Sequence, residues 1–331
     1  MASPDNDNPA NGRTLDLMVR QIRFEGKGIN SYEFVDPEGE ALPPFTAGAH
    51  IDIHLKGGTV RQYSLSNAPS ERHRYVIAVL RDEAGRGGSK AVHDTLRVQD
   101  RVKVSAPRNN FELAADAKKV VLLAGGIGVT PLKAMAHRLE EAGIEYEMHY
   151  CAKDARCTAF TDELASIKSA GHLHFHFDNG DPSAGLNIGE LLREPADDTH
   201  VYYCGPAGFM KACAAAAQHW PSGTVHFEHF KAPERDLSQQ VAGAVGEFIV
   251  KIASTGQMIP VTADQSIADA LDEAGVPIET SCRAGLCGTC KVRYLSGEVE
   301  HNDCILGDDE KRDYLTACVS RAVSRELVLD L

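Results

Sequence analysis

Four cysteines near the carboxyl end of the sequence constrain its fold most strongly. Cys282, Cys287 and Cys290 follow the pattern Cys-x4-Cys-x2-Cys, and Cys318 comes 28 positions after the third of them. This is the ligand spacing of plant-type [2Fe-2S] clusters. Three thiolates so close together must curl around a compact inorganic core. The glycines and other small residues between them permit the sharp backbone turns that this requires.

Two other uses of these cysteines agree less well with the sequence. A structural zinc site usually takes two close pairs of ligands, and no second pair lies near Cys318. Disulfides require an oxidising compartment, and the polar, acidic residues 1–9 lack the apolar core of an export signal. We therefore predict an iron–sulfur cluster. The remaining cysteines are expected to be buried or free thiols: Cys151, Cys157, Cys204, Cys213 and Cys304.

Length and charge narrow the class of protein. The 331 residues suggest two or three domains of about 100–150 residues each. No run of about 18 apolar residues marks a transmembrane helix. The net charge of −13 argues against nucleic-acid binding and would suit a basic protein partner, although it could equally serve solubility alone. We expect a monomeric cytoplasmic protein that binds neither nucleic acid nor membrane.

The region from residue 15 to residue 114 predicts a small antiparallel β-barrel. Its short alternating runs are separated by turn residues, and Gly57-Gly58 marks a hairpin between two of them. One short helix is expected over residues 90–96, and residues 1–14 are expected to form a disordered tail. The predicted strands of the barrel are 15–23, 50–55, 60–65, 74–80 and 101–105.

Residues 115–230 predict an α/β domain. The continuous apolar run 119–124 is typical of a parallel strand that is buried on both faces. Strands and helices then alternate, which predicts an open, mostly parallel sheet with helices on both faces. The further strands are expected at 146–151, 172–177, 200–204 and 224–230, and the helices at 131–141, 159–169, 188–193 and 208–218.

The rest of the chain predicts a linker followed by a small ferredoxin domain. Residues 231–246 lose the periodicity and contain proline, charged and small residues. Residues 247–331 then mix strands, one helix and the long cysteine-bearing loop, as a plant-type ferredoxin of the β-grasp class does. The strands are expected at 247–253, 258–262, 291–295 and 326–331, and the helix at 267–274.

The predicted barrel contains a candidate flavin site. Residues 61–65, Arg-Gln-Tyr-Ser-Leu, place Arg61 and Tyr63 on one face of a strand and Ser64 on the other. Arg61 could bind a phosphate, Tyr63 could pack on a ring, and Ser64 could hydrogen-bond a heteroaromatic nitrogen. An ordinary barrel strand explains these residues equally well on their own. The glycine-rich helix start at 87–89 adds an anion site and favours a flavin phosphate pocket.

The predicted parallel sheet contains a candidate nucleotide site. Residues 125–128, Gly-Gly-Ile-Gly, depart from the Gly-x-Gly-x-x-Gly fingerprint, so that motif is not assigned. Thr130 as N-cap and Pro131 in the first turn predict a helix whose positive end could hold a pyrophosphate. Cys204 begins a second strand-to-helix turn at the same sheet edge. A packed strand end is the simpler interpretation of that cysteine.

Together these motifs resemble the phthalate dioxygenase reductase family, the one-chain reductases of bacterial Rieske oxygenases. The resemblance runs from about residue 15 to residue 331, with the motifs in the family's order. It implies a flavin barrel, an NAD domain and a ferredoxin, with FMN, NADH and a [2Fe-2S] cluster. The cluster ligands would be the four cysteines described above. The FMN contacts would be Arg61, Gln62, Tyr63, Ser64, Ala78, Val79, Leu80, Gly87, Gly88, Ser89 and Phe230.

The resemblance also implies which residues meet NADH. Ser64 and Cys204 would lie beside the reacting atoms. Lys153 and Arg156 follow the second strand of the sheet, where they could meet a 2′-phosphate, so NADPH stays open as a donor. The implied NADH contacts are Gly125, Gly126, Ile127, Gly128, Thr130, Cys204, Gly205 and Pro206.

The function implied by the resemblance is that of the reductase of a Rieske-type oxygenase system in aromatic degradation. A hydride from NADH would reach FMN, and single electrons would pass through the cluster to a terminal oxygenase. A diiron monooxygenase is an alternative acceptor, but its reductases usually carry the ferredoxin first. A redox-sensing adaptor is a second alternative. Docking would use acidic residues of the ferredoxin: Glu298, Glu300, Asp303, Asp308, Asp309 and Glu310.

Overall fold

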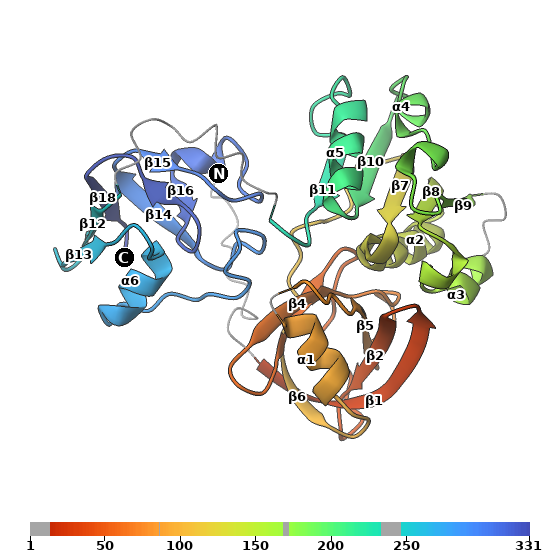
Figure 1. Ribbon diagram of the computed structural model, residues 1–331, viewed down its shortest axis with the longest axis horizontal. Helices are drawn as coiled ribbons and strands as arrows, with labels where there is room; N and C mark the ends of the chain where they lie inside the picture. The colour runs from red at the N-terminus through yellow and green to blue at the C-terminus, as the bar shows by residue number, and fades with distance from the viewer. Residues whose placement is uncertain (1–13, 86, 168–171, 233–245) are drawn as a thin grey trace. The chain divides into compact units, whose positions relative to one another are not determined.

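The structure, a computed structural model, describes residues 14–85, 87–167, 172–232 and 246–331. The chain divides into two compact units, Met1–Phe230 and Lys231–Leu331 (Figure 1). The predicted tail and linker therefore lie almost wholly outside the described residues. No helix within the described ranges is long and apolar enough to cross a membrane.

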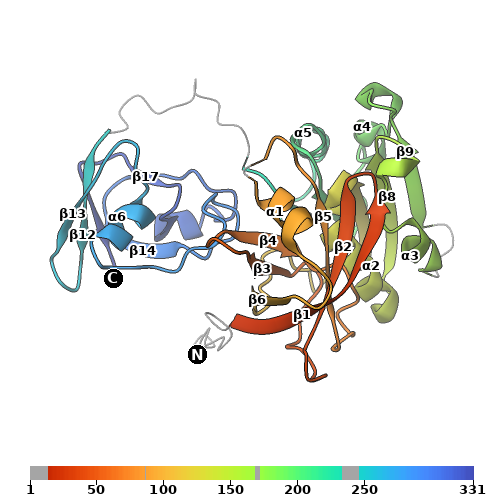
Figure 2. The ribbon, with the colours of Figure 1, turned by 60° about the horizontal axis from the view of Figure 1, so that its bottom comes forward.

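A six-stranded antiparallel sheet forms the first part of the larger unit, in the order β4-β3-β6-β1-β2-β5. The sheet closes into a barrel because the backbone N–H of Ser66, just after β4, donates to the carbonyl of Val76 in β5 at 2.8 Å. Helix α1 lies against β5 (Figure 2). The elements are β1 (Thr14–Gly26), β2 (Ile29–Val35), β3 (His50–His54), β4 (Val60–Ser64), β5 (Tyr75–Leu80), α1 (Gly88–Thr95) and β6 (Arg101–Ser105).

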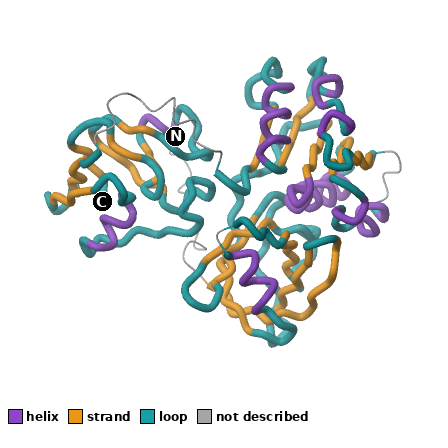
Figure 3. Tube along the Cα trace, viewed as in Figure 1, coloured by secondary structure: helices purple, strands orange, loops and turns teal. Residues whose placement is uncertain are grey.

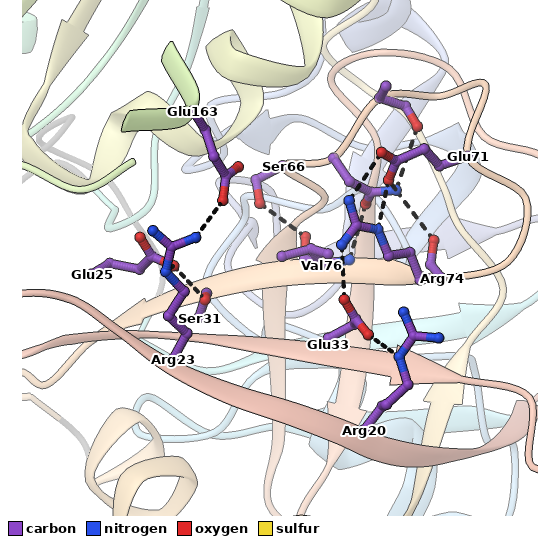
Figure 4. Close-up of polar contacts among 12 residues, drawn as sticks. Arg20, Arg23, Glu25, Ser31, Glu33, Ser66, Glu71, Arg74, Val76 and Glu163 are labelled. Atoms are coloured by element: carbon purple, nitrogen blue, oxygen red, sulfur yellow. Dashed lines mark hydrogen bonds and ion pairs between the residues drawn. The ribbon is translucent and has the colours of Figure 1, made fainter. Parts of the chain in front are cut away.

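Strand β2 is absent from the sequence-based prediction. Its sequence does not show the alternation of apolar and polar residues that marks a strand. Two of its buried positions hold polar residues, Ser31 and Glu33. Glu33 lies between Arg20 of β1 and Arg74, and its Oε2 is 2.8 Å from Arg74 Nη1 (Figure 4). Neighbouring side chains thus compensate the polar groups that made this segment look unlike a strand.

The second part of the larger unit is a parallel sheet in the order β11-β10-β7-β8-β9. Val120 and Leu122 of β7 pack with α2 on one face, whereas Val121 and Leu123 pack with α5 on the other. The predicted α/β arrangement is confirmed. The elements are β7 (Lys119–Gly125), α2 (Val129–Ala142), β8 (Glu145–Ala152), α3 (Thr161–Ser166), β9 (Leu173–Phe177), α4 (Ile188–Leu191), β10 (Thr199–Cys204), α5 (Ala207–Ala216) and β11 (Val225–Glu228).

The smaller unit holds a five-stranded mixed sheet in the order β13-β12-β18-β14-β16, with α6 packed on it (Figure 3). β12 and β18 are parallel, and their neighbours are antiparallel. This agrees with the predicted ferredoxin, although the short strands β15, β16 and β17 were not predicted. The elements are β12 (Phe248–Ile252), β13 (Met258–Val261), α6 (Ile267–Glu273), β14 (Lys291–Ser296), β15 (Val299–Glu300), β16 (Tyr314–Thr316), β17 (Arg321–Ala322) and β18 (Glu326–Leu329).

Candidate functional site

The four predicted cluster ligands gather as two pairs in the loops beside β14 and β16. Cys290 Sγ lies 2.9 Å from Cys318 Sγ, and the Cys282 and Cys287 thiols share a hydrogen bond. Nowhere in the described ranges do three or more His, Cys, Asp or Glu side chains gather as a mononuclear site would require. Two pairs of thiolates suit two irons with two ligands each, so this donor set fits a [2Fe-2S] cluster better than one zinc ion.

The backbone of the cysteine loop is shaped to surround sulfur. Arg283, Gly285 and Gly288 have positive φ angles of 48°, 70° and 68°. These turns point amide groups inward, and the N–H groups of Ala284 and Leu286 both lie 3.4 Å from Cys282 Sγ. Within each pair the shared hydrogen bond lowers the pKa of one thiol, Cys287 or Cys318, and raises that of its partner, Cys282 or Cys290.

The predicted flavin phosphate residues come together at the start of α1. Gly87 has a φ of 86°, and no described side chain caps the helix. A Cβ on Gly88 would lie 2.1 Å from Arg61 Nε, so the guanidinium passes directly over the helix start. Amide donors and a cation at one place fit a phosphate. The Ser89 hydroxyl accepts from the backbone N–H of Asp82 at 3.0 Å, which anchors the segment.

The neighbouring strands supply the other predicted flavin residues. Ala78 and Val79 of β5 are buried, whereas Leu80 is 40% exposed. Gln62 of β4 lies opposite Asp52 of β3 in the sheet. Tyr63, also of β4, packs against the barrel core, and burial raises the pKa of its phenol. Residues of β4 and β5 thus frame one surface of the barrel beside the start of α1.

Ser64 meets the parallel sheet at a residue that the sequence analysis missed. Its Oγ donates to Glu228 Oε2 at 3.4 Å, and Glu228 lies opposite Cys204 in the β10–β11 pair. Burial raises the pKa of Glu228 to about 8 and that of Cys204 well above its usual value. Phe230 follows two residues later and is 37% exposed. The predicted catalytic residues Ser64 and Cys204 are therefore linked through Glu228.

The available sequence signal for Glu228 was its position near the carboxyl end of the predicted strand 224–230. That signal is weak, because a glutamate at a strand end is usually solvated. Only the register that pairs β11 with β10, together with the contact from the barrel, identifies Glu228 as part of the site.

The glycine turn after β7 lies against the turn after β10. A Cβ on Gly128 would lie 2.1 Å from the carbonyl oxygen of Cys204, and one on Gly205 would lie 3.0 Å from Gly125 Cα. Pro206 lies equally close, 2.9 Å from a Cβ on Gly125. Glycine is therefore needed at these positions for the two turns to approach one another. Gly126 has a φ of 53° and open space around its α-carbon.

The prediction of Thr130 as N-cap is wrong. Gly126–Gly128 forms a 3-10 turn that runs directly into α2, so Gly128 holds the cap position and the helix begins at Val129. Thr130 lies inside the first turn, where its hydroxyl donates to the carbonyl of Ile127 at 3.1 Å. The start of α2 still presents its amide groups at the carboxyl edge of β7, as a pyrophosphate site needs.

Arg156, one of the two basic residues that follow β8, forms an ion pair with Asp154. Arg156 Nη2 lies 2.8 Å from Asp154 Oδ2, and the Asp154 Oδ1 atom accepts from the N–H groups of Arg156 and Cys157. These donors lower the pKa of Asp154 to about 2. Arg156, one of the two cations expected near a 2′-phosphate, is thus paired with a carboxylate.

Some of the acidic residues proposed for docking are exposed, and others form ion pairs or hydrogen bonds within the protein. Glu298 and Asp308 are exposed, whereas Glu310 Oε1 lies 2.6 Å from Lys291 Nζ. The side chain of Asp303 has no solvent exposure. Asp303 was wrongly placed on the docking surface, because its carboxylate folds back onto the backbone of its own turn.

Comparison with known proteins gives two family matches and several relatives that cover nearly the whole chain. Residues 250–323 match the 2Fe-2S iron-sulfur cluster binding domain, and residues 122–215 match the oxidoreductase NAD-binding domain. The reductase subunit of tert-butanol monooxygenase / tert-amyl alcohol desaturase from Aquincola tertiaricarbonis is 52% identical over 96% of both chains. Phthalate dioxygenase reductase from Burkholderia cepacia is 42% identical over 96% of this chain and 97% of its own.

A solved structure agrees with these relatives. The structure described as phthalate dioxygenase reductase, a modular structure for electron transfer from pyridine nucleotides to [2Fe-2S], is 41% identical. It superposes with a TM-score of 0.73 over 98% of this chain and 99% of its own.

Proposed function

The chain belongs to the phthalate dioxygenase reductase family, and from this membership we propose that it is the reductase component of a Rieske-type oxygenase system. It is an oxidoreductase whose cofactors are NADH, FMN and a [2Fe-2S] cluster. FMN, when bound, accepts the two electrons of a hydride and releases them singly to the one-electron cluster. The residues described above bind these cofactors, orient them and hold protons near them.

The observation that carries the proposal is the contact of Ser64 with Glu228 beside Cys204. Ser64 comes from the barrel and Glu228 from the edge of the parallel sheet, so the contact joins a flavin surface to a nucleotide surface. Glu228, with a pKa of about 8, holds a proton at neutral pH. Buried Cys204 keeps its thiol neutral, so no negative charge opposes the approach of a hydride donor.

We assign the binding residues by the same geometry. Arg61 and the α1 start hold the FMN phosphate, and Tyr63, Phe230 and residues 78–80 border the rest of the flavin. The glycine turn and residues 204–206 hold the nucleotide. The four cysteines hold the cluster. The corresponding domains are a tail at 1–14, an FMN barrel at 15–114, an NAD domain at 115–230, a linker at 231–246 and a ferredoxin at 247–331.

The acceptor is an oxygenase that binds the ferredoxin through exposed acidic residues such as Glu298 and Asp308. Relatives with 52% and 42% identity serve an alcohol monooxygenase and a phthalate dioxygenase, so the partner determines which compound is oxidised. Aromatic degradation therefore remains a prediction, as do the monomeric state and the cytoplasmic location. The carboxyl-terminal ferredoxin favours a Rieske partner over a diiron monooxygenase.

Stopped-flow spectroscopy of Cys290→Ser tests the electron order. We expect NADH to reduce the flavin at the wild-type rate, because Cys290 belongs to the other unit. Reduction of cytochrome c should fall at least tenfold, because single electrons leave through the cluster. Cys304→Ser, which removes an exposed cysteine outside the ligand set, is the matched control. Unchanged cytochrome c reduction in Cys290→Ser would refute the order. Absence of NADH turnover in the wild type would favour the adaptor.

A further inference from the structure

We propose that Asp303 is a buried negative charge behind the cysteine loop that lowers the reduction potential of the [2Fe-2S] cluster. The inference rests on the proposed function and adds a residue that determines how electrons divide between flavin and cluster. It concerns only the smaller unit, because Asp303 and the four cysteines all lie within it.

Asp303 is held as a buried carboxylate. Its side chain has no solvent exposure. Its Oδ1 accepts hydrogen bonds from the backbone N–H groups of Ile305 at 3.1 Å and Leu306 at 2.8 Å. Its Oδ2 has no hydrogen-bond partner among the described residues. The negative charge is therefore fixed in place but only partly compensated.

The segment that carries Asp303 packs directly on the cysteine loop. Asp303 Cα lies 3.0 Å from the position that a Cβ on Gly285 would take, and the Cys304 N–H donates to the Gly285 carbonyl at 3.0 Å. Asn302 Nδ2 also donates to the carbonyl of Val319, the residue after Cys318, at 3.1 Å. Residues 302–304 thus form hydrogen bonds with the backbone of the cysteine loop and with the backbone next to Cys318.

Among the described residues, His301 is the only basic side chain within ion-pair distance of this carboxylate. Its Nδ1 lies 3.9 Å from Asp303 Oδ2 and also lacks a hydrogen-bond partner in the described part of the chain. Burial lowers the pKa of His301 below its usual range, so the imidazole is neutral at pH 7. The charge of Lys311 also lowers the pKa of His301, whereas the charge of Asp303 and the Lys311 backbone hydrogen bond raise it, so burial is the effect that prevails.

An uncompensated charge in this position acts on the cluster through the low-dielectric interior. Reduction adds one negative charge to the cluster, and a neighbouring carboxylate opposes that addition more strongly in protein than in water. Net charge and hydrogen bonding around the sulfurs are known determinants of iron–sulfur potentials. Asp303 should therefore make the reduced cluster a stronger donor to the oxygenase.

Asp303→Asn in the full-length holoprotein is the direct test. Asparagine keeps an Oδ1 acceptor for Ile305 and Leu306 but removes the charge. In an EPR-monitored redox titration, we expect the cluster potential to rise by about 59 mV or more, which is a tenfold shift of a one-electron equilibrium. The flavin potential, measured in the same titration by absorbance, should not change. Asp308→Asn removes an exposed charge from the same segment and should leave both potentials unchanged.

Equal potentials in Asp303→Asn and wild type, or an equal shift in Asp308→Asn, would overturn the inference. If Asp303→Asn does not incorporate iron, Asp303→Ser provides the same test, because its hydroxyl can accept one of the two N–H bonds. Failure of the proposed function would look different. In that case the wild-type protein itself would show no [2Fe-2S] EPR signal on reduction with NADH.

Discussion

At the scale of single residues, the site depends on how burial changes proton affinity. Glu228, Cys204 and Asp154 are ordinary side chains with shifted pKa values, and the cause differs between them. Burial raises the pKa of Glu228 and Cys204, whereas hydrogen bonds from Arg156 and two backbone amides lower the pKa of Asp154. Each shift leads to a pH or specificity effect that can be measured.

Glu228 should make flavin reduction depend on pH. Its pKa of about 8 means that the carboxyl group is protonated below pH 8 and charged above it. We expect the stopped-flow rate of flavin reduction by NADH to fall between pH 7 and pH 9, as the Glu228 carboxyl group loses its proton. Glu228→Gln, which remains neutral, should lose this pH dependence. The same fall in the variant would assign it to another group.

The raised pKa of Glu228 also has a stability consequence. The carboxyl group releases its proton near pH 4.5 in the unfolded chain and near pH 8 in the folded chain. The folded state therefore binds more protons in this window, and the free energy of unfolding should decrease as pH rises from 4.5 to 8. Urea denaturation of the wild type and Glu228→Gln at several pH values measures the difference.

Asp154 should determine the preference between NADH and NADPH. Asp154→Asn keeps the Oδ1 acceptor of the turn but releases Arg156 from its ion pair. We expect kcat/KM for NADPH, relative to NADH, to rise about tenfold. Asp197→Asn, which changes an exposed carboxylate in the turn before β10, is the control. An unchanged ratio would mean that the 2′-phosphate does not bind beside Arg156.

At the scale of elements, helix α2 joins the parallel sheet to the barrel. Lys133 of α2 is buried, and its Nζ lies 3.0 Å from the carbonyl of Ser66 after β4 and 2.7 Å from Glu163 Oε2 of α3. Glu163 also contacts Arg23 of β1, whose Nη1 lies 3.1 Å from Oε1 (Figure 4). The segment after Ser64 is thus fixed by a network that crosses between barrel and sheet.

Lys133→Met should destabilise this connection. The substitution keeps the apolar stem but removes both contacts of the ammonium group. Because Glu163 is 40% exposed and can be rehydrated, we expect the free energy of unfolding to fall by about 1–2 kcal/mol in urea. Lys118→Met removes the exposed pair with Asp198 and should leave the free energy of unfolding almost unchanged. Equal losses in the two variants would argue against a structural role for Lys133.

Elements also show what sequence reasoning could recover. The apolar run of β7 and the cysteine spacing identify their structures because each pattern has few alternatives. Strand β2 escaped prediction because Glu33 is buried beside two arginines that are distant in sequence. The cap of α2 was misplaced because a 3-10 turn preceded the helix. Glu228 was missed because its role depends on a contact with Ser64, 164 residues away in sequence.

At the scale of the whole molecule, each unit has a hydrophobic core of its own. Buried side chains of the smaller unit form one cluster around α6 and β12, and the larger unit contains separate clusters in its barrel and its sheet. Separate cores imply that the two units can fold independently. Flavin reduction then belongs to the larger unit, and electron delivery through the cluster belongs to the smaller unit.

A chain ending at Phe230 should therefore retain one activity and lose the other. We expect it to bind FMN and to reduce ferricyanide with NADH within about twofold of the intact rate, because the Ser64–Glu228 contact lies inside the larger unit. Reduction of cytochrome c should be lost with the cluster. A truncated chain that folds, as judged by circular dichroism, but does not oxidise NADH would show that the larger unit is incomplete alone.

The position of β18 determines when the ferredoxin sheet can be completed. β18 lies between β12 and β14, and its Leu327 and Leu329 are fully buried. Translation must therefore pass Leu329 before the centre of this sheet exists. Iron can enter a finished site only after β18 has been synthesised, and a premature stop codon a few positions before Leu329 would leave the cysteine loops without the central strand of their sheet.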